Sequence, residues 1–151
     1  MPTTHQQLLY HIVFSTKNRK PYLANERRRV HVFAYMAGIA KNVGGFALEV
    51  GGWVEHVHLL VQIPAKLAVS DFVGRLKAST SKHVNETSGL SQKFGWQDGF
   101  GAFTVSVSQK AAVAKYIRSQ AEHHGRVSFQ DEYLLLLEKH QVEFDPRFVW
   151  D

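Results

Sequence analysis

The sequence predicts a single α+β domain in which helices cover one face of a four-stranded antiparallel sheet, followed by a C-terminal tyrosine-bearing helix. Four short segments are rich in β-branched, aliphatic and aromatic residues, and two of them, 56–63 and 103–107, alternate as strands do. Segments with apolar residues at helical spacing separate them, in the order β-α-β-β-α-β-α plus a terminal helix. The 151 residues contain no repeat, linker or low-complexity tract, so we assign residues 1–151 to one domain.

The first third of the chain is expected to form a strand and a helix. Residues 8–15 are dominated by aliphatic and aromatic side chains, which predicts a strand. A basic turn with Lys17 and Arg19 follows. Asn25 is a suitable N-cap for a helix that ends near the glycines at 44–45.

The middle of the chain is expected to form a hairpin and a second helix. Residues 46–50 and 56–63 should pair as antiparallel strands joined through the glycines at 51–52 or slightly later. Pro64 ends the second of these strands, because proline cannot donate to the ladder. Ser70 is then expected to cap the next helix.

The last third of the chain is expected to form a loop, a strand and two helices. Residues 90–101 are rich in glycine and aromatic residues, and residues 103–107 alternate as a strand does. A helix is expected from Ala111 to His124, and a capping-box-like start at Ser128 begins the terminal helix. The whole order matches the ferredoxin-like layout, which RNA-recognition domains share, so the fold alone does not decide function.

Two histidines in the middle strand are the first candidates for a functional site. His56 and His58 are two residues apart, so both point to the same face of the sheet. Such a pair can supply part of a divalent-metal site. For an isolated His-x-His on a strand, a metal site is the less frequent explanation. More often one histidine is hydrogen-bonded in the core and the other lies in solvent.

The predicted helix at 111–124 adds three polar side chains along one edge. Tyr116, Gln120 and His123 recur at helical spacing beside the apolar stripe. With the two histidines, an amide oxygen would make an open site suited to a labile Mg²⁺ or Mn²⁺. A tyrosine one turn away could attack a bound phosphodiester as a covalent nucleophile. Taken singly, Tyr116 and Gln120 are ordinary helix residues, and His123 and His124 read as helix-end surface residues.

Composition restricts the class of partner. Lys and Arg number 18 against 13 Asp and Glu, a formal charge of +5, which favours a polyanion such as nucleic acid. The absence of cysteine excludes disulfides and thiolate zinc sites and fits a cytoplasmic location. No apolar run approaches the ~20 residues of a membrane span, so no membrane partner is expected.

The combination of motifs resembles a known family, the single-tyrosine HUH transposases of small bacterial insertion sequences, including the REP-associated tyrosine transposases. The resemblance covers nearly the whole chain and rests on five blocks, HIVFSTKNR (11–19), EHVHLLV (55–61), WQDGFGAF (96–103), YIRSQ with EHH (116–124) and FVWD (148–151). One departure is Glu55, where many relatives have aspartate.

The resemblance implies a function and a set of residues. Tyr116 would be the nucleophile that takes the 5′ phosphate of single-stranded DNA, with Mg²⁺ or Mn²⁺ held by His56, His58 and Gln120. The substrate would have hairpin ends, and the protein would be a bacterial, cytoplasmic homodimer. Residues around the ligands would include Glu55 and His123. Independently of the resemblance, the cations expected to contact DNA are Lys17, Arg19, Lys77, Lys82 and Arg118, although a solvated polar face would look the same in sequence.

Three alternatives remain open at this point. The first is a domesticated relative with the same nicking chemistry but no mobile element. The second is a non-catalytic nucleic-acid-binding module of the RNA-recognition type, which would expose aromatic residues on its central strands. The third is a zinc hydrolase, which would need a stronger third ligand than Gln120, for example His123.

Overall fold

The computed structural model, which describes residues 3–87 and 89–150, contains the predicted four-stranded sheet. Its strands lie in the order β2 (Phe46–Gly52), β3 (His56–Gln62), β1 (Leu9–Ser15) and β4 (Gly101–Val105). Every neighbouring pair is antiparallel. This α+β arrangement confirms the predicted fold class, with β1 and β3 in the centre and β2 and β4 at the edges.

The strand register assigns the two histidines to one face. His58 lies opposite Val13 on β1 and opposite Gly51 on β2, and His11 lies opposite Phe103 on β4. Residues paired across a sheet share a face, so these side chains line a common surface. The alternate residues of β1 and β3 point to the other face and are aliphatic or aromatic there.

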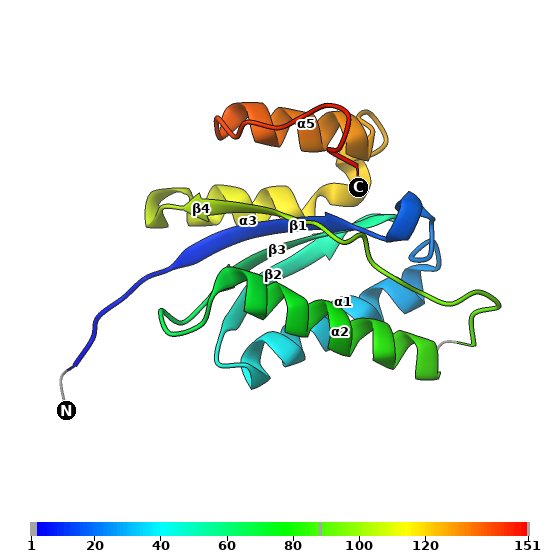
Figure 1. Ribbon diagram of the computed structural model, residues 1–151, viewed down its shortest axis with the longest axis horizontal. Helices are drawn as coiled ribbons and strands as arrows, with labels where there is room; N and C mark the ends of the chain where they lie inside the picture. The colour runs from blue at the N-terminus through cyan, green and yellow to red at the C-terminus, as the bar shows by residue number, and fades with distance from the viewer. Residues whose placement is uncertain (1–2, 88, 151) are drawn as a thin grey trace.

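Two helices cover this apolar face, as Figure 1 shows. They are α1 (Glu26–Asn42), capped by the Asn25 side chain as predicted, and α2 (Val69–Thr87), which begins one residue before the predicted cap. Between them and the sheet lies the main core, which includes Ile12, Phe14, Val57, Leu59, Met36 and Phe72. Burial of this apolar surface holds the sheet and both helices together.

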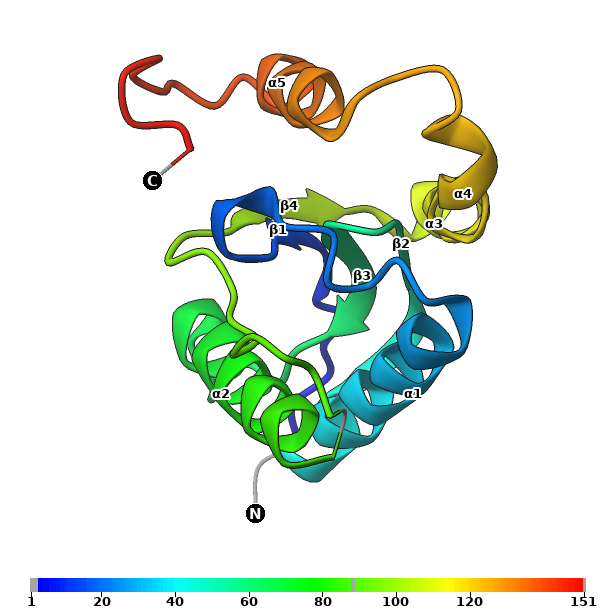
Figure 2. The ribbon, with the colours of Figure 1, turned by 90° about the vertical axis from the view of Figure 1, so that its right-hand side faces the viewer.

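The remaining helices lie on the histidine-bearing face, opposite α1 and α2 (Figures 1 and 2). These are α3 (Lys110–Arg118), the single turn α4 (Gln120–His123) and α5 (Phe129–Lys139), whose N-cap is Ser128 as predicted. A small second core of Val13, Phe103, Phe129, Tyr133 and Leu137 joins α5 to the sheet. Across residues 3–87 and 89–150, none of the helices has both the length and the apolar character that a membrane span requires.

The prediction of one continuous helix from Ala111 to His124 is wrong. The chain leaves helical geometry at Ser119, where φ is −93° and ψ is 13°. The Ser119 hydroxyl donates to the Lys115 carbonyl at 2.9 Å, and its amide is shared between two carbonyls. Serine that bonds back to the preceding turn bends a helix. The fourth strand also differs: it spans Gly101–Val105 and ends where a short 3₁₀ turn, Val107–Gln109, begins.

A glycine on β2 lets α3, the helix that carries Tyr116, lie directly on the sheet. A Cβ atom at Gly51 would lie 2.5 Å from the carbonyl oxygen of Ile117 and 2.9 Å from its side chain. Ile117 itself is fully buried. Gly51 therefore fixes the distance of α3 from the strand that pairs with His58, and so the height of Tyr116 above it.

We expect Gly51→Ala to push α3 away from β2. Overpacking of this kind lowers the free energy of unfolding by about 1–3 kcal/mol. The matched control is Gly74→Ala on α2, where an added Cβ meets nothing within 4 Å. Alanine there should be neutral or stabilising by up to about 1 kcal/mol. Urea unfolding of both variants measures the difference, and equal stabilities would contradict the close contact.

Candidate functional site

His56 and His58 are both completely buried on the face that carries α3 to α5. The Nδ1 atom of His56 lies 2.6 Å from Oε1 of Glu55. Because a carboxylate only accepts, Nδ1 carries a proton, and Nε2 is the ring nitrogen that faces the site. Glu55 therefore orients the His56 ring.

The tyrosine helix and the turn after it bring two predicted residues to these histidines. Oε1 of Gln120 lies 2.9 Å from Nε2 of His56, and Gln120 is buried. The ring of Tyr116 packs edge-on against His58, with centroids 5.7 Å apart. The four candidates thus gather within one chain, despite the helix break at Ser119.

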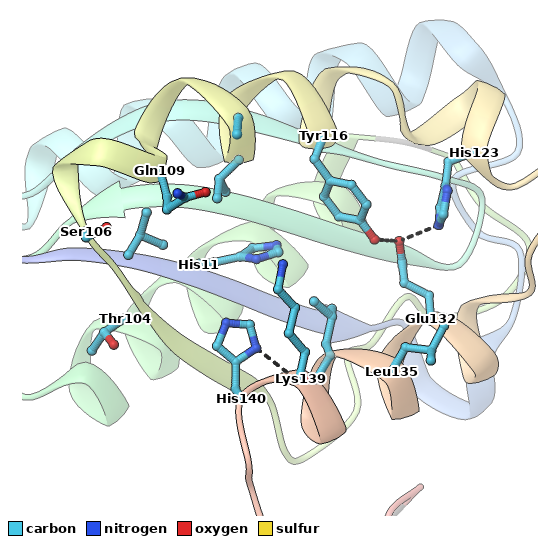
Figure 3. A pocket seen from close by; sticks show the side chains of 14 residues that line it. His11, Thr104, Ser106, Gln109, Tyr116, His123, Glu132, Leu135, Lys139 and His140 are labelled. Carbon is cyan, nitrogen blue, oxygen red and sulfur yellow. Dashed lines mark hydrogen bonds and ion pairs between the residues drawn. The ribbon is translucent and has the colours of Figure 1, made fainter.

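A carboxylate from α5, which the sequence prediction missed, lies in the middle of the site. Glu132 is 2% exposed, and its Oε1 lies 3.0 Å from Nε2 of His58 and 3.1 Å from Nε2 of His124. Its Oε2 accepts hydrogen bonds from the Tyr116 hydroxyl and from Nε2 of Gln120. Figure 3 shows Tyr116 and His123 both pointing to this carboxylate.

His124 was also missed, because its position at the end of the predicted helix indicated a surface residue. Its side chain is only 3% exposed, and Nδ1 lies 2.7 Å from the carbonyl oxygen of Val127. A carbonyl fixes a proton on Nδ1, so Nε2 presents an unshared pair whenever the ring is neutral. That atom lies 2.8 Å from Oε1 of Gln120.

The site holds more acceptors than protons. The Nε2 atoms of His56 and His124 both face Oε1 of Gln120 and Oε1 of Glu132, at 2.8–3.5 Å. With neutral rings these are acceptors facing acceptors, which repel unless a positive charge lies between them. Among the residues that the structure describes, this group (His56, His58, His124 and Glu132) is the one whose ligand atoms all lie within 4.8 Å of one another. Its donor set fits a divalent cation.

Comparison with known proteins identifies the family. The family model described as "Transposase IS200 like" matches residues 4–120. This chain belongs to the IS200-like transposases. The transposase of insertion sequence element IS200 from Salmonella typhimurium is 33% identical over 118 residues, which cover 75% of this chain and 76% of that protein. The ISDra2 transposase TnpA from Deinococcus radiodurans is 29% identical over 119 residues, covering 76% and 84%.

Solved structures support the fold of this transposase. A putative transposase from Deinococcus radiodurans superimposes with a TM-score of 0.62 and 23% identity, covering 80% of this chain and 96% of that one. A REP-associated tyrosine transposase bound to a REP hairpin has a TM-score of 0.59 and 15% identity, covering 84% and 76%. The match to the family ends at residue 120, so His124 and Glu132 lie beyond it.

Burial and charge set the protonation of the transposase site. Burial lowers the pKa of His58 to about 4, although its hydrogen bond to Glu132 opposes this shift. Burial also holds the pKa of His11, whose Nε2 lies 2.7 Å from Nδ1 of His58, well below its ordinary value. Burial and the neighbouring Glu132 carboxylate raise the pKa of Tyr116, so its phenol stays protonated at neutral pH.

Glu132 itself stays ionised. Burial opposes its charge, but hydrogen bonds from His124 and His58 outweigh burial and hold the pKa of the carboxyl far below its ordinary range. The same contact raises the pKa of His124 against the effect of burial. In the metal-free protein, hydrogen bonds to Glu132, that of His124 above all, thus offset the negative charge that a bound cation would otherwise offset.

A cavity of about 560 Å³ leads to the tyrosine between α3, β4 and α5 (Figure 3). Tyr116, His11 and Glu132 line one part of it, and Lys139 and His140 of α5 line another. This volume is in the range of small-molecule sites and suffices for a nucleotide. Lys139 was not among the predicted cations.

The cations predicted to contact DNA lie on several surfaces of the transposase. Lys82 is exposed on α2, on the side of the sheet away from Tyr116, and Lys17 is exposed in the turn after β1. Arg19 lies over the Trp150 ring, and Arg118 pairs with Glu49 at 2.9 Å.

The Lys77 side chain makes hydrogen bonds within the protein. Its ammonium group donates to the carbonyl oxygens of Gln97 at 2.8 Å and Gly99 at 2.6 Å, and lies over the Phe14 ring. These contacts hold the loop before β4 and argue against the predicted phosphate contact.

The low pKa values of His11 and His58 predict a pH dependence of stability. Their folded-state pKa lies below that of the unfolded chain, so the unfolded chain binds more protons between about pH 4 and 6.5. The free energy of unfolding should therefore fall as pH falls through this window, by up to about 1.4 kcal/mol per pH unit for each proton.

Denaturant unfolding at several pH values, with a chelator present, measures this slope. His11→Gln should make it shallower, whereas His5→Gln, which changes an exposed histidine, should leave it unchanged. Identical slopes for His11→Gln and the parent protein would contradict a buried neutral His11.

Proposed function

We propose that this transposase cleaves and rejoins single-stranded DNA through a 5′-phosphotyrosine at Tyr116, with Mg²⁺ or Mn²⁺ held by His56, His58 and Gln120. One observation carries the proposal: the Glu132 carboxylate contacts both the Tyr116 hydroxyl and the converging imidazoles. The proposed nucleophile and the proposed cation site therefore share one contact, the Glu132 carboxylate. Membership in the IS200-like transposases supports the same chemistry.

In the proposed reaction the Tyr116 oxygen attacks the phosphorus, and the bond from phosphorus to the 3′ oxygen breaks. The phenol proton passes to Oε2 of Glu132, which already accepts its hydrogen bond. The leaving 3′ oxygen takes up a proton and becomes a hydroxyl. The phosphotyrosine keeps the energy of the broken bond, so a second 3′ hydroxyl can attack it and restore the phenol without ATP.

The other residues orient these groups. Glu55 holds the His56 ring, and His123 contacts the oxygen of Glu132 that faces Tyr116, at 3.2 Å. A bound divalent ion would supply neutralisation of phosphate charge and polarisation of the phosphorus. The cavity beside Tyr116 would receive the nucleotide next to the broken bond, with Lys139 near its phosphate.

The partners are also proposals. The REP-associated transposase of similar fold is bound to a REP hairpin, and we propose that this chain likewise recognises hairpin ends. We further propose a homodimer, for which the unpaired edges of β2 and β4 are available. Tyr116 lies beside His58 of its own chain, so a dimer is not required to bring these two residues together.

The structure disfavours a non-catalytic module of the RNA-recognition type. Such modules stack bases on exposed aromatic residues of the central strands. Here Phe14 of β1 is fully buried beneath the sheet, and the opposite face presents His11, His56 and His58. A domesticated nicking relative would use the same residues and the same chemistry as the proposed transposase.

Tyr116→Phe should abolish covalent attachment while leaving single-strand binding nearly unchanged, because only the nucleophilic oxygen is lost. The matched control is Tyr35→Phe on α1, on the far side of the sheet. Single-stranded DNA from the flanks of the gene, labelled at its 3′ end, should migrate with the parent and control proteins on a denaturing gel. A 5′ label should instead appear on a free, shorter fragment. Label retained by Tyr116→Phe would overturn the assignment.

Lys139→Gln should weaken single-strand binding severalfold, because its ammonium lines the cavity beside Tyr116. The slope of log affinity against log salt should become shallower by about one, as for one lost phosphate contact. Lys82→Gln tests the predicted contact on α2, and Lys41→Gln at the end of α1 serves as the control. Binding titrations at several salt concentrations measure these slopes, and a Lys139 variant that matches the control excludes DNA from this cavity.

A further inference from the structure

Two residues beyond the family match point into the proposed cation site. We propose that His124 and Glu132, both in the C-terminal segment, are themselves ligands of the divalent cation. This inference rests on the proposed function and assigns the site two more ligands than the predicted set of His56, His58 and Gln120.

The distances agree with ligands around one ion. Oε1 of Glu132 lies 3.0, 3.1 and 3.5 Å from the Nε2 atoms of His58, His124 and His56. With bonds of about 2.1 Å, neighbouring ligand atoms lie about 3.0 Å apart at right angles and about 3.4 Å apart at tetrahedral angles. When the Nδ1 atoms of His56 and His124 hold the only ring protons, their Nε2 atoms cannot donate to this oxygen, but they can share a cation with it.

The two residues are prepared for this role. The Val127 carbonyl fixes the proton of His124 on Nδ1, just as Glu55 does for His56, which leaves Nε2 free to bind a metal. Phe129, on the first turn of α5, stacks on the His56 ring with centroids 4.5 Å apart. This stacking places the start of α5, and hence Glu132 one turn later, against the histidines.

The enlarged ligand set changes the expected metal preference. Three imidazole nitrogens, one carboxylate oxygen and one amide oxygen favour Mn²⁺, Co²⁺ or Zn²⁺ over Mg²⁺, which prefers oxygen and water. The carboxylate would then use Oε1 for the ion and Oε2 for Tyr116, so it would link the cation to the nucleophile. This arrangement also supplies the positive charge that the ionised Glu132 needs.

Titration with Mn²⁺ alone, followed by electron paramagnetic resonance, tests the proposal without any reaction. Glu132→Gln and His124→Asn should each weaken Mn²⁺ binding about tenfold or more. Glu138→Gln, an exposed carboxylate of the same helix, and His31→Asn, an exposed histidine on α1, should change it less than twofold. Nitrogen hyperfine couplings to bound Mn²⁺ should report three imidazoles in the parent protein and two in His124→Asn. Circular dichroism of the metal-free variants checks that they fold.

The outcomes separate this inference from the proposed function. If Glu132→Gln and His124→Asn bind Mn²⁺ as the parent does, while His56→Ala does not, the inference is overturned and the proposed site of three ligands stands. If the parent protein binds no Mn²⁺, the cation part of the proposed function fails as well. Should Glu132→Gln not fold, the hyperfine count in His124→Asn decides the matter, because that residue lies before α5.

Discussion

The ionised carboxylate of Glu132, buried among imidazoles, is the group on which the rest of the site depends. Burial of such a charge costs several kcal/mol unless donors or a cation compensate it. Its partners come from β3, α3 and the turn around α4, so one carboxylate connects the sheet, the tyrosine helix and α5. The layer above the sheet therefore combines this polar cluster with the small second core, whereas the layer below the sheet is an ordinary apolar core.

The positions of the side chains in this polar layer are well defined because the apolar layer below it is rigid. The main core fixes β1 and β3, and the register of those strands places His11, His56 and His58 on one surface. Gly51 then allows α3 to approach the sheet closely. The bend at Ser119 redirects the chain so that Gln120 and His124 meet the same point that Tyr116 reaches from the preceding turn.

Local patterns were sufficient to predict much of this arrangement. The two-residue period of β3 places His56 and His58 together, and helical spacing associates Tyr116 with Gln120. Both inferences hold despite the break at Ser119. Gln120 begins the next short helix, yet its side chain still contacts His56. The pairing of the hairpin also follows from spacing and turn residues.

The parts that were missed depend on tertiary contacts. Glu132 reads as one of several acidic residues at the start of a helix, and only the docking of α5 through Phe129 and Tyr133 brings it to the histidines. His124 becomes a site residue because the chain turns after α4. Lys77 looks like a surface cation in sequence, yet the loop before β4 folds over it and takes all its hydrogen bonds.

The central claim is that unshared electron pairs from β3, α4 and α5 converge on one cation. Anomalous diffraction from crystals soaked in Mn²⁺ tests it most directly. The account predicts one strong peak within bonding distance of Nε2 of His56 and His58 and of Oε1 of Glu132. A peak elsewhere on the protein with none between these atoms, or no peak at all at saturating Mn²⁺, would contradict it.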